Sequence, residues 1–153
     1  MDVYEKLKQS GIVISNVEAP CGSFKLGKEF GSNLLYMSGT GPVDEMTLAG
    51  QIGKELTLEQ GIQAARSVGI SVISNIHAVI GDLNRIKNIV KVLGFINSAP
   101  GFTQQPTVLN GFSDLMIEIF GPEVGSHARS AIGASVLPFN IPVEVEVLVE
   151  LKS

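Results

Sequence analysis

The sequence has few charged or aromatic residues and only one cysteine. Of its 153 residues, 17% are charged and 6% are aromatic, whereas 44% are hydrophobic. The lone Cys21 excludes a disulfide within the chain and any metal site that needs several cysteines. Because 15 acidic residues outnumber 11 basic ones, the chain lacks the positive charge typical of nucleic-acid-binding proteins. We therefore expect no nucleic-acid partner.

Long hydrophobic runs are also missing. No run reaches the roughly 18–20 residues of a transmembrane helix, and the polar first ten residues are unlike a signal peptide. These absences predict a cytoplasmic protein that does not associate with membranes. The mean hydropathy of +0.30 is nevertheless high, which suggests that apolar surface is covered by self-association. The length and the lack of a linker predict one domain over residues 1–153.

Capping residues and apolar spacing predict one short and two long helices. The predicted limits are Asp2 to Gly11, Thr57 to Gly81 and Pro106 to Gly121. The longest helix begins with a capping box, in which Thr57 and Gln60 satisfy each other's backbone N–H groups. Apolar residues recur at helical spacing in both long helices. They are Ile62, Ala65, Val72, Ile73, Ile76 and Ile80 in the first, and Val108, Phe112, Leu115, Met116, Ile119 and Phe120 in the second.

Four segments are predicted to be strands, because they are rich in β-branched residues or alternate between apolar and polar residues. They are Asn33–Ser38, Ile86–Asn97, Ala128–Leu137 and Val143–Leu151. Residues 20–31 are predicted to form a loop, and residues 44–56 a turn-rich connection with at most a short strand. The order of elements predicts an α+β fold, in which two helices pack on one face of a mixed sheet.

One arginine is a candidate ligand-binding residue. Alternation along its strand places Arg129 on one face with His127, Ala131 and Gly133. Because Ala131 and Gly133 have almost no side chain, we expect Arg129 to lie in a recess, where its planar guanidinium could bind a carboxylate with two hydrogen bonds. Alternatively, Arg129 pairs with a glutamate of the last strand or of a neighbouring chain.

The last strand offers candidate partners for this arginine. If it pairs antiparallel with the Arg129 strand, Glu144 and Glu146 lie near the recess. A carboxylate there could orient water or take up a proton. The alternative is a solvent-facing charge or a salt-bridge partner.

Several other motifs carry little information. Gly39-Thr-Gly41 lacks the third glycine of a dinucleotide-binding loop, and we interpret it as a turn. His77 and His127 have no ligand cluster nearby, so we expect no metal site. Cys21 lies in no nucleophile motif, and we interpret it as a small packing residue.

Several blocks of the sequence resemble the RidA/YjgF family, also called the L-PSP endoribonuclease family, over nearly the whole chain. The blocks are Asn33-Leu-Leu-Tyr-Met-Ser-Gly39, Val90-Lys-Val-Leu-Gly-Phe-Ile-Asn97, Asn110, His127-Ala-Arg-Ser-Ala131, and Leu137-Pro138 leading into Val143-Glu-Val-Glu146. The N-terminal extension, residues 1–20, and the stretch 98–106 are similar to a divergent bacterial branch.

The resemblance implies a chorismate-mutase-like fold assembled as a homotrimer with clefts between subunits. It also implies a deaminase that hydrolyses reactive enamines and imines, such as 2-aminoacrylate, to 2-keto acids and ammonia. This chemistry needs no cofactor, metal or covalent nucleophile, because the imine carbon is already electrophilic. The resemblance leaves two alternatives open, namely a non-catalytic protein that binds small carboxylates and a ribonuclease. The second is disfavoured, since a basic patch and a histidine pair are missing.

The resemblance also implies roles for individual residues. Arg129 matches the arginine that holds the substrate carboxylate, and Glu144 matches the glutamate that positions the attacking water. Asn110 lines the cleft, and Ser38 and Gly39 form the strand end beside it.

Two substrate-binding positions depart from the family pattern. Phe24 stands where RidA has a tyrosine, so the ring is kept and the hydroxyl is lost. Ala131 stands where RidA has a cysteine.

Overall fold

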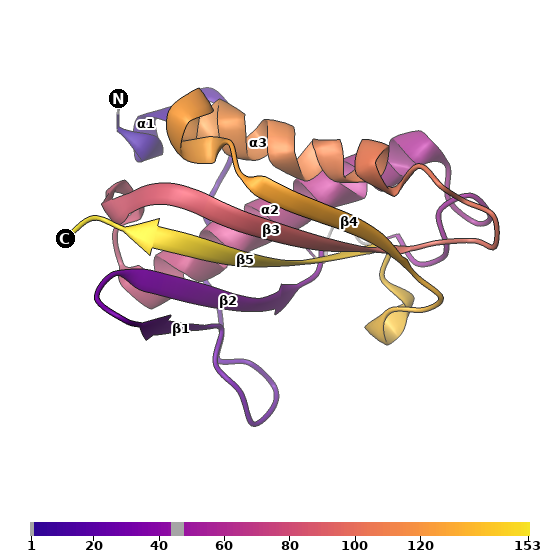
Figure 1. The fold of residues 1–153 in the computed structure, drawn as a ribbon, viewed down its shortest axis with the longest axis horizontal. Helices are drawn as coiled ribbons and strands as arrows, with labels where there is room; N and C mark the ends of the chain where they lie inside the picture. The colour runs from indigo at the N-terminus through magenta and orange to yellow at the C-terminus, as the bar shows by residue number, and fades with distance from the viewer. Residues whose placement is uncertain (1, 44–47) are drawn as a thin grey trace.

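The computed structural model describes residues 2–43 and 48–153, which form a five-stranded mixed sheet and three α-helices (Figure 1). The strand order is β1-β2-β5-β3-β4. The strands are β1 (Gly27–Phe30), β2 (Leu34–Thr40), β3 (Ile86–Asn97), β4 (Ala128–Ala134) and β5 (Val143–Leu151). Neighbouring strands are antiparallel except β3 and β4, which are parallel. The α+β class and the mixed sheet are therefore confirmed.

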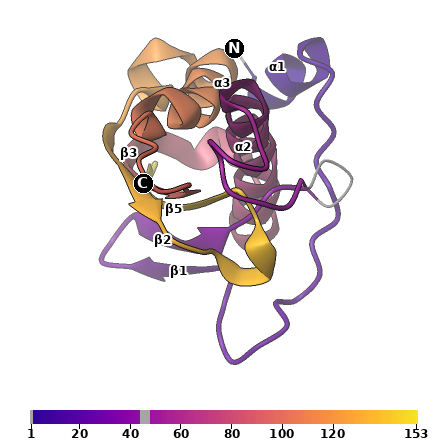
Figure 2. The same cartoon turned by 90° about the vertical axis from the view of Figure 1, so that its right-hand side faces the viewer.

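The two long helices, α2 (Leu58–Ile80) and α3 (Gln105–Gly125), cover one face of the sheet (Figure 2). The predicted capping box begins α2, because the Thr57 N–H donates to Gln60 Oε1 (2.9 Å) and the Gln60 N–H donates to Thr57 Oγ1 (3.2 Å). Gly81, with φ of 77°, ends this helix as predicted. The start of α3 at Gln105 agrees with Pro106 in its first turn.

The hydrophobic core lies between the sheet and these two helices. In β5 every second side chain is buried, beginning with Val143 and ending with Leu151. The helices themselves touch at Gly111 of α3, where a Cβ atom would collide with the backbone carbonyl of Ile62 in α2. Glycine at position 111 thus allows the two helices to pack closely.

Helix α1 (Val3–Gln9) is held against the end of α2 by the side chain of Tyr4. The Tyr4 hydroxyl accepts a hydrogen bond from the backbone N–H of Leu83 (2.9 Å) and contacts Nδ1 of His77 (3.1 Å). The predicted cap is also present, since Asp2 accepts from the N–H of Tyr4 (2.9 Å). Tyr4 thus joins the N-terminal helix to the end of α2, and Leu7 of the same helix is buried in the core.

We expect Tyr4→Phe to lower the free energy of unfolding by about 1–3 kcal/mol, because the N–H of buried Leu83 loses its acceptor. Urea unfolding followed by circular dichroism measures the change. The control is Lys152→Met, which removes an exposed hydrogen bond to the carbonyl of Asn84 and should cost less than about 0.5 kcal/mol. Equal losses in both variants would contradict the structural role of Tyr4.

Several predictions differ from the structure. Strand β2 runs to Thr40 rather than Ser38, so Gly39 and Thr40 belong to the strand and the interpretation of Gly39-Thr-Gly41 as a turn was wrong. The segment predicted as a loop contains β1, an exposed edge strand paired with β2 that has no buried alternation. Strand β4 ends at Ala134 rather than Leu137, because its partner β3 ends at Asn97, opposite Ala134. Helix α3 breaks at Gly121 as predicted, with φ of 82°, but a further turn follows to Gly125. Residues 44–47 of the connection predicted over 44–56 lie outside the described residues. In the described part of this connection, Ile52 forms isolated β-bridges with Leu56 and with Ser98.

In the described part of the chain, no helix combines the length and apolar character that crossing a membrane requires.

Candidate functional site

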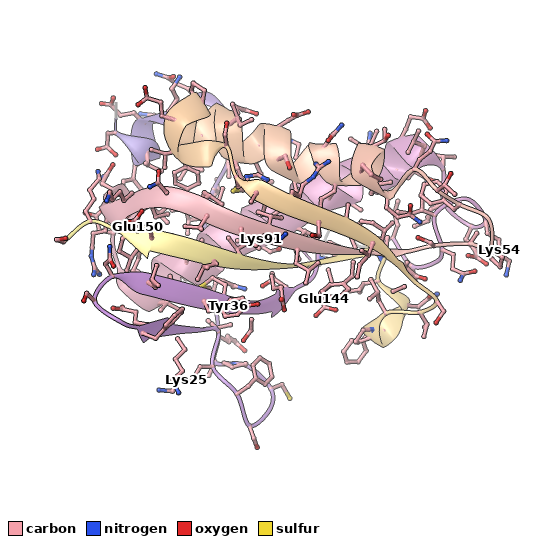
Figure 3. All side chains as sticks on the ribbon, in the orientation of Figure 1. Lys25, Tyr36, Lys54, Lys91, Glu144 and Glu150 are labelled. Carbon is pink, nitrogen blue, oxygen red and sulfur yellow. The ribbon has the colours of Figure 1, made fainter. Side chains whose placement is uncertain are left out.

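Glu144 lies on the face of the sheet opposite the helices, beside the end of β2 (Figure 3). Its carboxylate stands directly over Gly39, where any Cβ atom would collide with Glu144 Oε1. A register shift in the β2–β5 pairing falls between Met37 and Thr40, so that Gly39 lies within this irregularity. The missing side chain at position 39 therefore makes room for the Glu144 carboxylate.

Ser38 joins the loop before β1 to this end of β2. Its backbone N–H donates to the carbonyl of Leu26 (2.8 Å), and its hydroxyl donates to the carbonyl of Lys25 (2.6 Å). Phe24, the residue before Lys25, is 55% exposed. The structure thus groups Ser38, Gly39 and Glu144, and it ties the backbone next to Phe24 to the same place.

Burial raises the pKa of the Glu144 carboxyl, and the negative charge of Glu146 raises it further. The Tyr36 hydroxyl donates to Glu146 Oε1 (2.8 Å), and this bond raises the pKa of Tyr36. A half-buried carboxylate whose pKa lies above its ordinary value is suited to take a proton from water.

Arg129 forms a second group, in which α3 holds its guanidinium. Nη1 donates to Asn110 Oδ1 (2.8 Å) and Ser113 Oγ (3.1 Å), and Nη2 donates to the carbonyl of Pro106 (3.3 Å). Asn110 and Arg129 are therefore together, as the resemblance implied. Within residues 2–43 and 48–153 these partners are all neutral, so the alternative pairing of Arg129 with a glutamate of its own chain is not observed.

The space above Ala131 and Gly133 is not an open recess. Ala131 packs against the hydrophobic core. A Cβ atom on Gly133 would lie 3.0 Å from Gln105 Nε2 and 3.3 Å from Ser98 Oγ. Side chains at the start of α3 and at the end of β3 thus border Gly133, so the space predicted above Ala131 and Gly133 is partly filled, whereas Arg129 does line a cavity on the side of His127.

The predicted meeting of Glu144 and Arg129 within one chain is also wrong. Strand β3 separates the two strands, because it pairs with β5 on one side and with β4 on the other. Arg129 lies opposite the buried Val92 and points toward the helices, whereas Glu144 lies opposite Phe95 and points away from them. The seven predicted residues therefore form two groups on opposite faces of the sheet.

Two residues beside Arg129 were not predicted to belong to a site. Ser113 Oγ is 2.9 Å from Nε2 of His127, whose Nδ1 is 2.6 Å from the carbonyl of Gly125. Ser113 follows Asn110 by three residues, a spacing that places both on one side of a helix. That spacing, combined with the alternation of His127 and Arg129, is the signal that would have identified the cluster.

Two further predictions concern reactive or ligating side chains. Cys21 is exposed in the loop before β1, so its interpretation as a packing residue was wrong. No group of three or more potential metal ligands occurs among the residues that the structure describes.

Comparisons with known proteins agree with this fold. A sequence model described as "YjgF/chorismate mutase-like, putative endoribonuclease" matches residues 5–151. Protein TCP17 of Trypanosoma cruzi is 40% identical over 153 residues, covering 99% of this chain and 95% of that protein. Relatives at this level of identity therefore occur outside bacteria.

Two solved structures are similar over almost the whole chain. One is a "putative endoribonuclease" from Shewanella oneidensis MR-1, with a TM-score of 0.91, 31% identity, and coverage of 99% of this chain and 100% of that one. The other is protein Atu1372 of unknown function from Agrobacterium tumefaciens, with a TM-score of 0.87, 31% identity, and coverage of 99% and 92%. The chain belongs to the YjgF/chorismate mutase-like family.

Proposed function

We propose that the protein hydrolyses small 2-imino acids, and the enamines from which they form, to 2-keto acids and ammonia. The observation that carries the proposal is the half-buried Glu144 carboxylate, whose pKa is raised by burial and which stands over the side-chain-free Gly39. Such a group can accept a proton from a water molecule held beside it. Arg129 supplies the planar cation that a substrate carboxylate requires.

The proposed reaction needs little from the protein beyond positioning. Arg129 binds the substrate carboxylate, and Glu144 takes a proton from water as the water oxygen attacks the C=N carbon. Glu144 returns this proton to the nitrogen, which gives the carbinolamine. It then takes the proton of the carbinolamine hydroxyl and passes it to the amine as the C–N bond breaks, so that the C=O group forms, ammonia leaves and Glu144 is ionised again. Ser38 and Gly39 border the water, and Asn110 borders the carboxylate.

We further propose that the active site forms between two copies in a homotrimer, with Phe24 and Ala131 at its edges. The support is geometric, since Arg129 and Glu144 lie on opposite faces of one chain. In the described residues no helix covers the face that carries Glu144, and apolar side chains such as Tyr36 (48% exposed) and Ile132 (46% exposed) lie there. Light scattering should give three times the 16.2 kDa chain mass, and a monomer would contradict this proposal.

Mixing two inactive variants tests whether both groups serve one site. Arg129→Ala keeps Glu144, and Glu144→Ala keeps Arg129. Randomly mixed trimers should recover about a quarter of wild-type activity, because some interfaces then pair an intact Arg129 with an intact Glu144. No recovery in trimers shown to be mixed would contradict a site shared between copies.

Turnover itself is tested by trapping. An amino-acid oxidase generates the imino acid, and semicarbazide captures whatever has not been hydrolysed. The wild-type protein should divert the imine to keto acid, and Glu144→Gln should not. If several imines are unaffected while pyruvate still binds, the protein is instead a non-catalytic carboxylate-binding protein.

The pH profile provides a separate test of Glu144. As a base, Glu144 acts only when ionised, so activity should fall as the pH drops through its raised pKa. We expect Glu146→Gln to move this acid limb to lower pH, because it removes the negative charge that raises the pKa of Glu144. Glu150→Gln, at the other end of β5, is the control and should leave the limb in place. A limb that shifts equally in both variants would contradict the assignment.

A further inference from the structure

Behind Arg129 lies a chain of hydrogen bonds that has one consistent direction. A backbone carbonyl only accepts, so the 2.6 Å contact with Gly125 requires the hydrogen of His127 to be on Nδ1. Burial lowers the pKa of His127, and the charge of Arg129 lowers it too; together they outweigh the hydrogen bond to Gly125, which raises it. The ring is therefore neutral near pH 7, and Nε2 is an acceptor. Ser113 therefore donates to Nε2 (2.9 Å) and offers its lone pairs to Arg129 (3.1 Å).

The imidazole itself is held in place by its surroundings. Its ring meets the buried ring of Phe112 edge-on, with the centroids 6.3 Å apart. Phe112 precedes Ser113 in α3, whereas His127 lies directly before β4. The two ends of the Ser113–His127 bond thus come from elements that pack against each other, which fixes the direction of the Ser113 hydroxyl.

Some of the guanidinium N–H donors of Arg129 remain available to a ligand. Arginine has five N–H donors. Two on Nη1 bind Asn110 and Ser113, and one on Nη2 binds the carbonyl of Pro106. Across residues 2–43 and 48–153, no acceptor binds the Nε hydrogen or the second Nη2 hydrogen. A cavity of about 280 Å³ adjoins this group, lined by Ser113, Ile117, Ser126, His127 and Arg129.

We propose that Ser113 is a positioning residue for Arg129, and that His127, held by the carbonyl of Gly125, sets the direction of the Ser113 hydroxyl. Together they leave Nε and Nη2 of Arg129 as the pair of donors for a small carboxylate, which binds them through its two oxygens. This inference rests on the proposed function in one respect, namely that Arg129 binds the carboxylate. It adds the residues that determine how the carboxylate is presented.

The first test needs no ligand. The Nε–H signal of Arg129, recorded at low temperature to slow its exchange with water and identified by its loss in Arg129→Lys, should be sharp in the nuclear magnetic resonance spectrum of the wild-type protein. Ser113→Ala should broaden it, because one Nη1 hydrogen bond is lost, and Ser113→Thr should restore it, because the hydroxyl returns. Long-range ¹⁵N spectra should show the His127 hydrogen on Nδ1. An unchanged Arg129 signal in Ser113→Ala, or a hydrogen on Nε2, would overturn the proposal.

The second test separates binding from chemistry, with pyruvate as the probe. Ser113→Ala should weaken pyruvate binding and raise KM by about tenfold, the contribution of one hydrogen bond to a charged group, while kcat changes less than about twofold. Ser113→Thr should recover most of the affinity. Unchanged affinity with a reduced kcat would place Ser113 in the chemistry and overturn its positioning role. If the wild-type protein binds no pyruvate, the proposed function fails at its binding step, and the Arg129 signal still decides the inference.

Discussion

Arg129→Lys should weaken the binding of small carboxylates by about 100-fold and reduce kcat/KM at least as much, although the positive charge is kept. The guanidinium uses three donors to bind Asn110, Ser113 and the carbonyl of Pro106. An ammonium group has three donors in all and is not planar. A lysine at position 129 therefore cannot satisfy α3 and hold both carboxylate oxygens at the same time.

Calorimetric titration with pyruvate measures the binding loss, and the trapping assay measures the loss of activity. The matched control is Arg66→Lys, which makes the same change at a surface ion pair with Glu118 and should leave both quantities within about twofold. Arg129→Lys with near-normal affinity would mean that the positive charge alone binds the ligand. In that case the hydrogen-bonded edge of Arg129 would have no role in recognition.

The elements that sequence reasoning placed well are those whose pattern reflects burial. Strand β5 was predicted from Val143 to Leu151 because apolar residues occupy every second position, and the structure buries these residues. The limits of α2 followed from the capping box at Thr57 and from Gly81. Strand β1 has no such pattern, since Lys28, Glu29 and Phe30 are all exposed, and pairing with β2 alone makes it a strand.

The order of the strands, which decides which site residues lie close together, could not be predicted from local sequence patterns. Alternation correctly assigned the faces of Arg129 and Glu144 within their own strands, but it carries no information about which strands are neighbours. The insertion of β3 between β4 and β5 is a long-range feature, set by packing of the whole sheet. For the same reason the Ser113–His127 contact was missed, because it depends on how α3 crosses β4.

The second large effect concerns the residue that faces the catalytic carboxylate in our proposal. Gly39→Ala should lower kcat by about 100-fold, because a displacement of about 1 Å in a reacting group can cost that much. The added methyl group would occupy the position of Glu144 Oε1, and the flexible end of this side chain must move. The KM should change little, since the substrate carboxylate is held at Arg129.

The matched control is Gly41→Ala, two residues along the chain, whose Cβ would meet Ile141 Cδ1 at 2.9 Å instead of a carboxylate. Both substitutions push on the end of a flexible side chain, so both should change the free energy of unfolding by less than about 1 kcal/mol. Only Gly39→Ala should lose turnover. The acid limb of its pH–activity profile should also shift, because the displaced Glu144 carboxylate lies at a different distance from the charge of Glu146. Equal turnover in the two variants would show that the position of Glu144 over Gly39 does not determine the rate, and the water-activating role of Glu144 would then have to be abandoned.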